Sequence, residues 1–261
     1  MITARDLTKS YGRKPVLRGV TFTARPGEIT LLVGPNGAGK STTMKVLTGL
    51  ARADGGEALI AGKDIAREKL AAQRQLSFLP QAPNFHPRFT CAQIVDFYAR
   101  LRGIDRARRD AALEAAGLRE VAHEQTRTLS GGMRQRLGMA LLLLPDAPVL
   151  LLDEPGISLD PAWRRRLQII LHDEAHGGKT VLVTTHLIAE WNNVAHRCLL
   201  CRDGVIEREL DPANLTDELD DLESRTNSSP SCATKKTPNR AVASAEADSP
   251  FLISQETTET A

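Results

Sequence analysis

The sequence lacks both an excess of charge and a long hydrophobic run. Its 261 residues carry a formal net charge of +2, which favours neither a nucleic-acid-binding protein nor an acidic scaffold. The longest apolar run, Met139–Leu144, stops at Pro145 and is far shorter than the ~20 residues that span a bilayer. The first residues also lack the charged and apolar segments of a secretory signal. We therefore expect a soluble chain that reaches a membrane only through a partner.

Cysteine is scarce, with four residues: Cys91, Cys198, Cys201 and Cys232. Their spacing forms no disulfide-like framework, so we expect a reducing, cytoplasmic environment. Cys198 and Cys201 make a C-x-x-C, a spacing that can bind a metal or act in redox chemistry. The pair lies in a predicted strand, however, where residues three apart point to opposite faces. We therefore expect both cysteines to be structural.

What the chain does contain is an alternation of short apolar runs and helical patterns over its first 210 residues. Apolar residues make up 41% and charged residues 25%, close to an ordinary globular protein. Ile29–Val33, Val149–Leu152 and Val181–Val183 are apolar or nearly so throughout, as strands buried on both faces are. Polar residues follow each of them, and sites collect at the carboxyl ends of parallel strands. The sequence predicts an α/β fold with a mainly parallel core sheet.

Between residues 83 and 145 the pattern becomes helical. Thr90 and Gln93 form a capping box at the start of a first helix. Second and third helices are expected to begin at Asp105 and Ser130. We predict a helical insertion in the α/β domain. Apolar residues follow Thr90 at helical spacing, namely Ile94, Phe97, Tyr98 and Leu101.

The composition changes near Glu223. From there on, large apolar residues are few and no periodicity is visible. We predict one domain over residues 1–222 and a disordered tail over residues 223–261.

Phosphate binding is predicted by the phosphate loop, residues 34–41, a complete G-x-x-x-x-G-K-S between a predicted strand and a predicted helix. Its glycines let backbone N–H groups turn inward around phosphates, and the helix N-terminus adds partial positive charge. Lys40 is expected to neutralise the β- and γ-phosphates, and Ser41 to bind Mg²⁺. A glycine-rich turn with an incidental lysine would not explain both flanking elements. The expected nucleotide-binding residues here are Gly34, Pro35, Asn36, Gly37, Ala38, Gly39, Lys40, Ser41 and Thr42.

A second element of the expected site is the acidic pair Asp153 and Glu154, at the end of a buried strand. Such a pair is costly to bury unless positive charge is held there, and Mg²⁺ beside Asp153 would provide it. Glu154 is placed to orient or deprotonate an attacking water. Taken alone, the two carboxylates would also fit a helix N-cap with a first-turn acid. Beside a phosphate loop, they indicate a P-loop NTPase.

The type of NTPase is indicated by the segment Leu129-Ser130-Gly131-Gly132-Met133-Arg134-Gln135. It resembles the signature motif of the ATP-binding cassette (ABC) family. Ser130 can cap a helix whose first turn holds Gly131 and Gly132, leaving an uncovered N-terminus that can receive an anion. Two glycines weaken a first helical turn, so a close backbone approach explains them better than an ordinary capped helix does.

The other elements of the ABC family appear in order, and the resemblance covers residues 2–210. Tyr11 resembles the aromatic residue that stacks on adenine, and Gln81 the glutamine that senses Mg²⁺. Ser158–Asp160 resembles the loop that crosses to the opposite subunit, and His186 the switch histidine. Any one of these residues alone is most often structural. The resemblance implies that the catalytic residues are Lys40, Glu154 and His186, and that the Mg²⁺ ligands are Ser41, Gln81 and Asp153.

The resemblance also implies an architecture and a set of partners. The fold would be a P-loop core with an N-terminal antiparallel β subdomain and the helical insertion. The chain would bind and hydrolyse ATP with Mg²⁺ and pair with a second ATPase subunit, most simply itself. A separate transmembrane permease, contacted near residues 82–89, would hold it at the cytoplasmic face of the cell membrane. The context Met133–Arg136 resembles that of small, separate-chain ABC-2-type exporters, so export is expected.

Two other readings stay open beside the transporter. A soluble ABC ATPase acting on ribosomes or nucleic acid would carry two cassettes or a long coiled-coil insertion, and neither is visible. We therefore expect no nucleic-acid partner. A regulatory module without turnover is disfavoured by the presence of Lys40, Glu154 and His186. Trp191 is unusual for the family and is expected to mark a particular partner.

Overall fold

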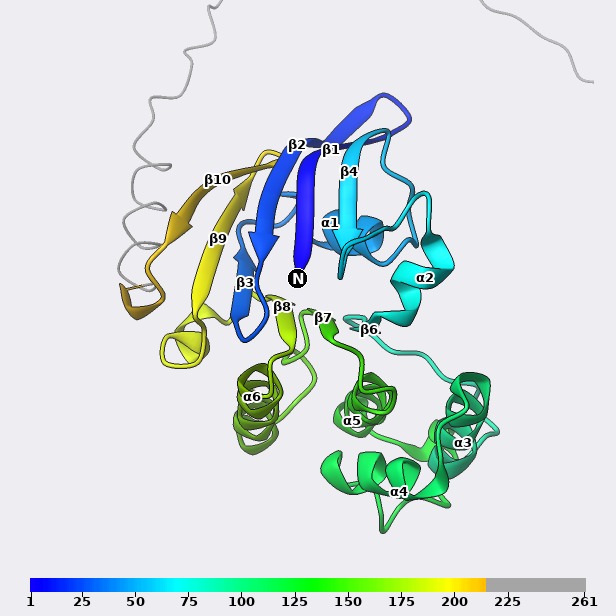
Figure 1. The fold of residues 1–261 in the computed structure, drawn as a ribbon. Helices are drawn as coiled ribbons and strands as arrows, with labels where there is room; N and C mark the ends of the chain where they lie inside the picture. Colours follow the sequence, from blue (N-terminus) through cyan, green and yellow to red (C-terminus); the bar gives the residue numbers. More distant parts are fainter. Residues whose placement is uncertain (215–261) are drawn as a thin grey trace, which may run out of the picture.

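The computed structural model describes residues 1–214, and its strands form two sheets (Figure 1). The strands are β1 (Ile2–Tyr11), β2 (Lys14–Ala24), β3 (Ile29–Val33), β4 (Gly55–Ile60), β5 (Lys63–Asp64), β6 (Leu76–Leu79), β7 (Val149–Asp153), β8 (Thr180–Thr184), β9 (Arg197–Arg202) and β10 (Val205–Leu210). The smaller sheet is antiparallel, in the order β2-β1-β4-β5. The larger has the order β10-β9-β3-β8-β7-β6, and only its edge strand β10 runs antiparallel. The predicted fold class is confirmed.

The helices of the described residues are α1 (Lys40–Leu47), α2 (Lys69–Arg74), α3 (Cys91–Arg102), α4 (Arg106–Ala115), α5 (Gly131–Leu143) and α6 (Pro161–His176), with 3-10 turns η1 (Thr126–Thr128), η2 (Ile188–Trp191) and η3 (Pro212–Asn214). Helices α5 and α6 cover one face of the core sheet, and the antiparallel sheet with α1 covers the other (Figure 1). One apolar cluster joins α1 to both sheets, a second packs α5 and α6 on the core sheet, and a third joins α3, α4 and α5. The helical insertion therefore has a core of its own.

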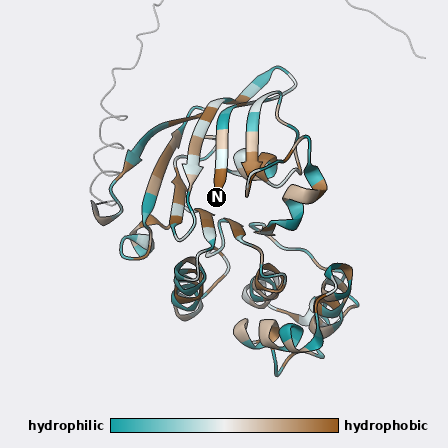
Figure 2. Ribbon diagram, viewed as in Figure 1, coloured by the Kyte–Doolittle hydropathy of each residue, from teal (hydrophilic) through white to brown (hydrophobic). Residues whose placement is uncertain are grey.

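The central strands are buried along their whole length. Every residue of β3, β7 and β8 is buried, because helices lie on one side and the antiparallel sheet on the other. Figure 2 shows mainly hydrophobic colour along β3 and β9. Continuous apolar runs rather than alternating ones are what such two-sided burial requires. Each carboxyl end therefore delivers its polar residues to the same edge of the sheet.

Helix α3 begins and ends where its sequence signals lie. The Thr90 hydroxyl accepts from the backbone of Gln93 and the Gln93 side chain accepts from the backbone of Thr90, so both halves of the capping box form. Gly103 ends the helix in a left-handed conformation. The apolar spacing nevertheless does not mark the buried face: Phe97, Tyr98 and Leu101 are 57%, 43% and 66% exposed.

The cysteines of the C-x-x-C lie on opposite faces of β9, as predicted. Cys198 belongs to the cluster packed against α6, and Cys201 to the cluster packed against α1. Both are buried and neither forms a disulfide, and Cys232 lies outside the described residues. Within residues 1–214, no group of three or more His, Cys, Asp or Glu side chains is arranged to hold a metal ion.

Trp191 does not present a surface to a partner. Its side chain is 3% exposed and packs in the cluster between the core sheet and α6, so the prediction that it marks a partner is wrong. The core needed a large apolar side chain at that point, which a motif comparison cannot show. Within residues 1–214, no helix is both long enough and apolar enough to cross a membrane. The predicted boundary at residue 222 and the predicted tail, residues 223–261, lie outside the described part of the chain.

Candidate active site

The phosphate loop connects the end of β3 to the start of α1. Gly34, Gly37 and Gly39 have φ values of 144°, 84° and 108°, a region that residues with a Cβ rarely adopt. A Cβ on Gly34 would lie 2.0 Å from the carbonyl oxygen of Cys201, and one on Gly39 would lie 2.8 Å from the Leu17 side chain. The loop therefore needs glycine for its conformation and, at two positions, for space.

The end of β9 and the turn that follows it hold the phosphate loop in place through hydrogen bonds to Ala38. The carbonyl oxygen of Ala38 accepts a hydrogen bond from the Gly204 amide at 3.1 Å and from the Cys201 thiol at 3.2 Å. Burial raises the pKa of Cys201 to about 11, so the thiol keeps the proton that it donates. This support comes from residues more than 160 positions further along the chain.

Lys40 is the first residue of α1 and is 8% exposed. Its ammonium group donates to the carbonyl oxygens of Gly34 at 2.7 Å and Pro35 at 3.1 Å. Both acceptors belong to the phosphate loop, so the ammonium group lies against the loop's own backbone. A buried ammonium group held by neutral carbonyls is available for stronger, charged acceptors.

Asp153, at the end of β7, is joined to the phosphate loop through one of its carboxylate oxygens. Oδ1 accepts from Ser41 Oγ at 3.3 Å and from Thr184 Oγ1 at 2.5 Å. The parallel pairing of β7 with β8 sets Asp153 opposite Thr184, which explains the second contact. Asp153 is 7% exposed, so its carboxylate and the Thr184 hydroxyl are both largely shielded from water.

Glu154 follows in a left-handed conformation, with φ of 49°, and is 9% exposed. Its amide donates to both the carbonyl and the hydroxyl oxygen of Thr184, each at 3.0 Å, which holds this turn. Its Oε2 lies 2.7 Å from His186 Nδ1 and accepts the His186 amide at 3.2 Å. Strained backbone that neighbouring contacts hold in place is common where a side chain must be aimed.

These groups surround a hollow of about 180 Å³, the phosphate hollow, lined by Val16, Asn36, Gly37, Gly39, Lys40, Ser41, Thr42, Gln81 and Glu154. The structure thus brings Gln81 and Glu154 to the phosphate loop. Tyr11 is not among its lining residues. It ends β1 with 50% exposure, and its ring lies 5.7 Å from the Lys9 ammonium, so its contact with adenine stays a prediction.

Ser130, Gly131 and Gly132 do not line the phosphate hollow either. Ser130 caps α5 by accepting from the Met133 amide at 3.1 Å, and the first turn of the helix is left at the surface. A Cβ on Gly132 would lie 2.9 Å from the Ser158 carbonyl oxygen. One of the two glycines is therefore explained by a close backbone approach within the same chain.

Comparison with known families assigns the chain. A family model described as ABC transporter matches residues 17–156, a range that holds the phosphate loop, Ser130–Gly132 and Glu154. The chain belongs to the ABC transporter family. It is an ATP-binding and ATP-hydrolysing subunit of this family.

Curated relatives carry the name Nod factor export ATP-binding protein I. That of Paraburkholderia xenovorans (strain LB400) is 38% identical over 200 residues, which cover 75% of this chain and 66% of the relative. That of Burkholderia orbicola (strain AU 1054) is 36% identical over 242 residues, which cover 84% of this chain and 80% of the relative. The chain thus spans about two thirds of the first relative and four fifths of the second.

Solved structures agree with the ABC fold. A structure titled as the ATP-binding subunit of an ABC transporter has a TM-score of 0.79 at 26% identity and covers 87% of this chain and 99% of its own. A dimeric ATP-binding cassette in a post-hydrolysis state, bound to ADP and Pi, has a TM-score of 0.74 at 28% identity, covering 81% and 99%. The ABC ATPase fold is therefore shown for this chain.

Sequence reasoning missed three supports of this ABC site. Thr184 holds both Asp153 and Glu154, and a polar residue at the end of a buried strand was the available signal. Cys201 holds the phosphate loop, but a C-x-x-C directs attention to metals instead. Gln135 donates to the Pro155 carbonyl oxygen at 3.1 Å and joins α5 to the segment after Glu154. No local pattern predicts that last contact.

Proposed function

We propose that this chain hydrolyses ATP in the phosphate hollow and that hydrolysis drives export through a separate permease. The observation that carries the proposal is the position of Glu154, which lines the hollow with Lys40 and is held by His186 at 2.7 Å. A carboxylate aimed at a phosphate-binding loop is placed to orient or deprotonate the water that attacks the γ-phosphate. His186 restrains that carboxylate but is not itself among the residues that line the hollow.

Lys40 and the phosphate loop bind the triphosphate in this proposal. The Lys40 ammonium group now contacts two neutral carbonyls of the loop. Phosphate oxygens carry more charge and are stronger acceptors, so we expect the ammonium to turn towards the β- and γ-phosphates. Backbone amides of the loop and the N-terminus of α1 add further favourable charge.

The donors at this site fit Mg²⁺. Ser41 Oγ and Asp153 Oδ1 lie 3.3 Å apart, and Gln81 lines the same hollow, so hydroxyl, carboxylate and amide oxygens are available. Magnesium prefers hard oxygen ligands and completes its shell with phosphate oxygens and water, so one carboxylate suffices. When bound, Mg²⁺ neutralises charge that develops on the phosphates. We propose Ser41, Asp153 and Gln81 as its protein ligands.

A second copy of the chain is proposed to complete each site. Ser130, Gly131 and Gly132 form a surface-exposed helix N-terminus that does not reach the chain's own phosphate hollow. Such an N-terminus stabilises an anion brought to it. In a head-to-tail dimer it would meet the γ-phosphate held by the other copy. The dimeric state of a similar cassette supports this arrangement.

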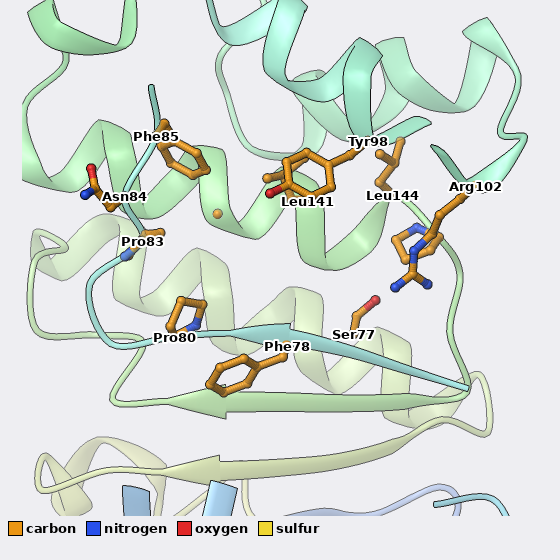
Figure 3. A pocket seen from close by; sticks show the side chains of 12 residues that line it. Ser77, Phe78, Pro80, Pro83, Asn84, Phe85, Tyr98, Arg102, Leu141 and Leu144 are labelled. Atoms are coloured by element: carbon orange, nitrogen blue, oxygen red, sulfur yellow. The ribbon is translucent and has the colours of Figure 1, made fainter. Parts of the chain in front are cut away.

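The permease is proposed to dock in a groove between β6 and the helices α3 and α5. A hollow of about 220 Å³ lies there, and Figure 3 shows Tyr98 and Leu141 facing the β6 segment that carries Phe78 and Pro80. Phe97 and Leu101 add exposed apolar surface on α3. Large exposed apolar patches mark protein contacts.

Arg102 gives this groove a charge. It lines both the hollow of Figure 3 and a neighbouring one of about 500 Å³ next to α2, so the two form one groove. Among residues 1–214, no acidic side chain forms an ion pair with Arg102. We propose that the docking segment of the permease is an apolar helix with an acidic residue opposite Arg102.

Export is proposed as the direction of transport, because similar curated proteins are named as export ATP-binding proteins. The chain would then work at the cytoplasmic face of the cell membrane, held there by the permease. The cargo would be selected by the permease and not by the residues described here.

The experiment is to tag the chain, extract it gently from native membranes, and identify by mass spectrometry what is bound. We expect a multi-span membrane protein in near-equal amount, together with Mg²⁺-dependent phosphate release that Glu154→Gln abolishes. Recovery of ribosomes or nucleic acid instead, with phosphate release intact, would reject the permease but keep the ATPase. Full phosphate release by Glu154→Gln would reject the assigned role of Glu154.

A further inference from the structure

Two neighbouring residues of α6, Trp163 and Arg164, contact two different working parts of the protein. Both are partly buried, and they lie three and four positions beyond Asp160, which caps the helix by accepting from the Trp163 amide. The site described above uses neither side chain. Their partners belong to different elements: the helix that begins with Ser130–Gly132, and the loop that carries His186.

The first link joins α6 to α5. The guanidinium carbon of Arg136 lies 4.2 Å from the centre of the Trp163 ring, a cation–π distance. Arg136 Nη2 also donates to the Gly117 carbonyl oxygen at 2.7 Å. A Cβ on Gly117 would lie 2.6 Å from the indole ring, so the ring fills the space that this glycine leaves. Trp163 is therefore held between Gly117 and Arg136.

The second link joins α6 to the switch loop, residues 185–191. Arg164 forms an ion pair with Glu190, and Gln168 donates to the Glu190 carbonyl oxygen at 3.0 Å. The aliphatic part of Arg164 also lies beside Gly156, two residues after Glu154. The first turns of α6 therefore hold the switch loop through Glu190, four residues after His186.

We infer that Trp163 and Arg164 are positioning residues that serve the two ATP sites of the proposed dimer from one helix. Trp163, through Arg136, positions Ser130–Gly132 for the ATP bound by the partner. Arg164, through Glu190, positions His186 for the ATP bound by its own chain. The inference rests on the proposed head-to-tail dimer, because only there do these two parts belong to different sites.

The physical reason is that α6 is a rigid support for two separate elements. Because α6 is rigid, weakening one link frees the element held by that link and leaves the element held by the other link in place. Removing a partly desolvated cation–π contact changes an equilibrium by about tenfold. That effect is large enough to measure as a rate and small enough to leave the fold intact.

The test uses mixed dimers in which one hydrolysing chain meets a tenfold excess of a Glu154→Gln partner, so that turnover occurs at one defined site. The reference is wild type with Glu154→Gln. Arg136→Gln is placed either in the hydrolysing chain or in the excess partner. We expect turnover within about twofold of the reference in the first mixture, and a loss of about tenfold in the second.

Arg164→Gln is expected to give the opposite pattern, slow in the hydrolysing chain and near the reference in the excess partner. Arg136→Lys in the excess partner should keep most of the reference turnover, because it leaves a cation over the Trp163 ring. Arg166→Gln, an equal loss of charge at an exposed position of the same helix, should match the reference in both mixtures.

The outcomes separate this inference from the dimer itself. Equal losses in both mixtures, or a reversed pattern for Arg136→Gln, would mean that the residue only stabilises its own chain and would overturn the inference. A reference mixture in which the chains do not associate with Mg-ATP would instead reject the proposed dimer. Near-reference turnover of both variants in both mixtures would also overturn the positioning roles.

Discussion

The buried thiol of Cys201 joins the phosphate loop to strand β9 by a hydrogen bond. It donates to Ala38 and is fully buried, and burial raises its pKa from the ordinary value of 9.0 to about 11. In the unfolded chain the same thiol loses its proton near pH 9. Between these two values the unfolded state binds fewer protons than the folded state, so stability falls as pH rises.

We therefore expect Cys201 to make the protein sensitive to alkaline conditions. From pH 9 to pH 11 its titration should remove ~2–3 kcal/mol of unfolding free energy, while below pH 9 the titration should have no effect. Urea unfolding of wild type and Cys201→Ala across this range measures the difference. The variant is expected to show a shallower decline, since it lacks the buried thiol. Parallel curves for the two proteins would contradict the prediction.

We expect Gly34 to be required because a side chain would not fit there. Gly37 is required only because its backbone has a positive φ. Both have positive φ, but a Cβ would meet the Cys201 carbonyl at 2.0 Å at Gly34 and nothing within 4 Å at Gly37. Gly37→Ala should cost ~1–2 kcal/mol of stability, and Gly34→Ala should cost more and abolish ATP binding. Calorimetry and nucleotide titration measure both. Equal effects of the two variants would refute the steric argument.

At the scale of elements, α3 shows what sequence reasoning could and could not supply. Its limits follow from the Thr90 capping box and from Gly103, which are local signals. Its buried face does not follow, because Val95 and Ala99 are buried while the larger Phe97 and Tyr98 are exposed. Periodicity shows that apolar residues share a face, but not whether that face meets the chain's own core or another protein.

The exposed face of α3 leads to a prediction for Arg102. Arg102→Glu should remove the permease from the purified complex, because it would place like charges opposite each other in the proposed groove. ATP hydrolysis by the isolated chain should stay within about twofold, since the groove lies outside the phosphate hollow. Arg106→Glu, the same charge change on α4, is the control. Retention of the permease by Arg102→Glu would reject this docking site.

At the scale of the whole molecule, the gathering of the motif residues at one edge of the core sheet could be predicted, and the contacts that support them could not. Lys40, Ser41, Asp153, Glu154 and His186 belong to contiguous motifs, and parallel strands bring the ends of those motifs together. Thr184, Cys201 and Gln135 act through contacts between distant segments. Such contacts depend on register and packing, which single-sequence patterns do not contain.

Glu154→Gln is expected to trap the dimer. The amide keeps the size of the side chain but cannot deprotonate water, so bound ATP would persist and hold the two copies together. Sedimentation with Mg-ATP should show a dimer for Glu154→Gln and a monomer for Lys40→Ala, which is expected to lose ATP affinity. A Glu154→Gln protein that stays monomeric at high concentration would contradict the proposed arrangement.

The order of strands in the core sheet has a consequence for synthesis. β3 leads into the phosphate loop and is flanked by β8 and β9. Within the loop, Ala38 accepts a hydrogen bond from Cys201, which lies 163 positions later in the chain. At about 5–20 residues per second, a ribosome needs roughly 8–30 s to make that stretch. During this interval the nascent chain has the ATP-binding motif but not the strands that shape it. Nucleotide can therefore stabilise only a nearly finished domain, and a chain released before residue 204 would meet cellular quality control without that ligand.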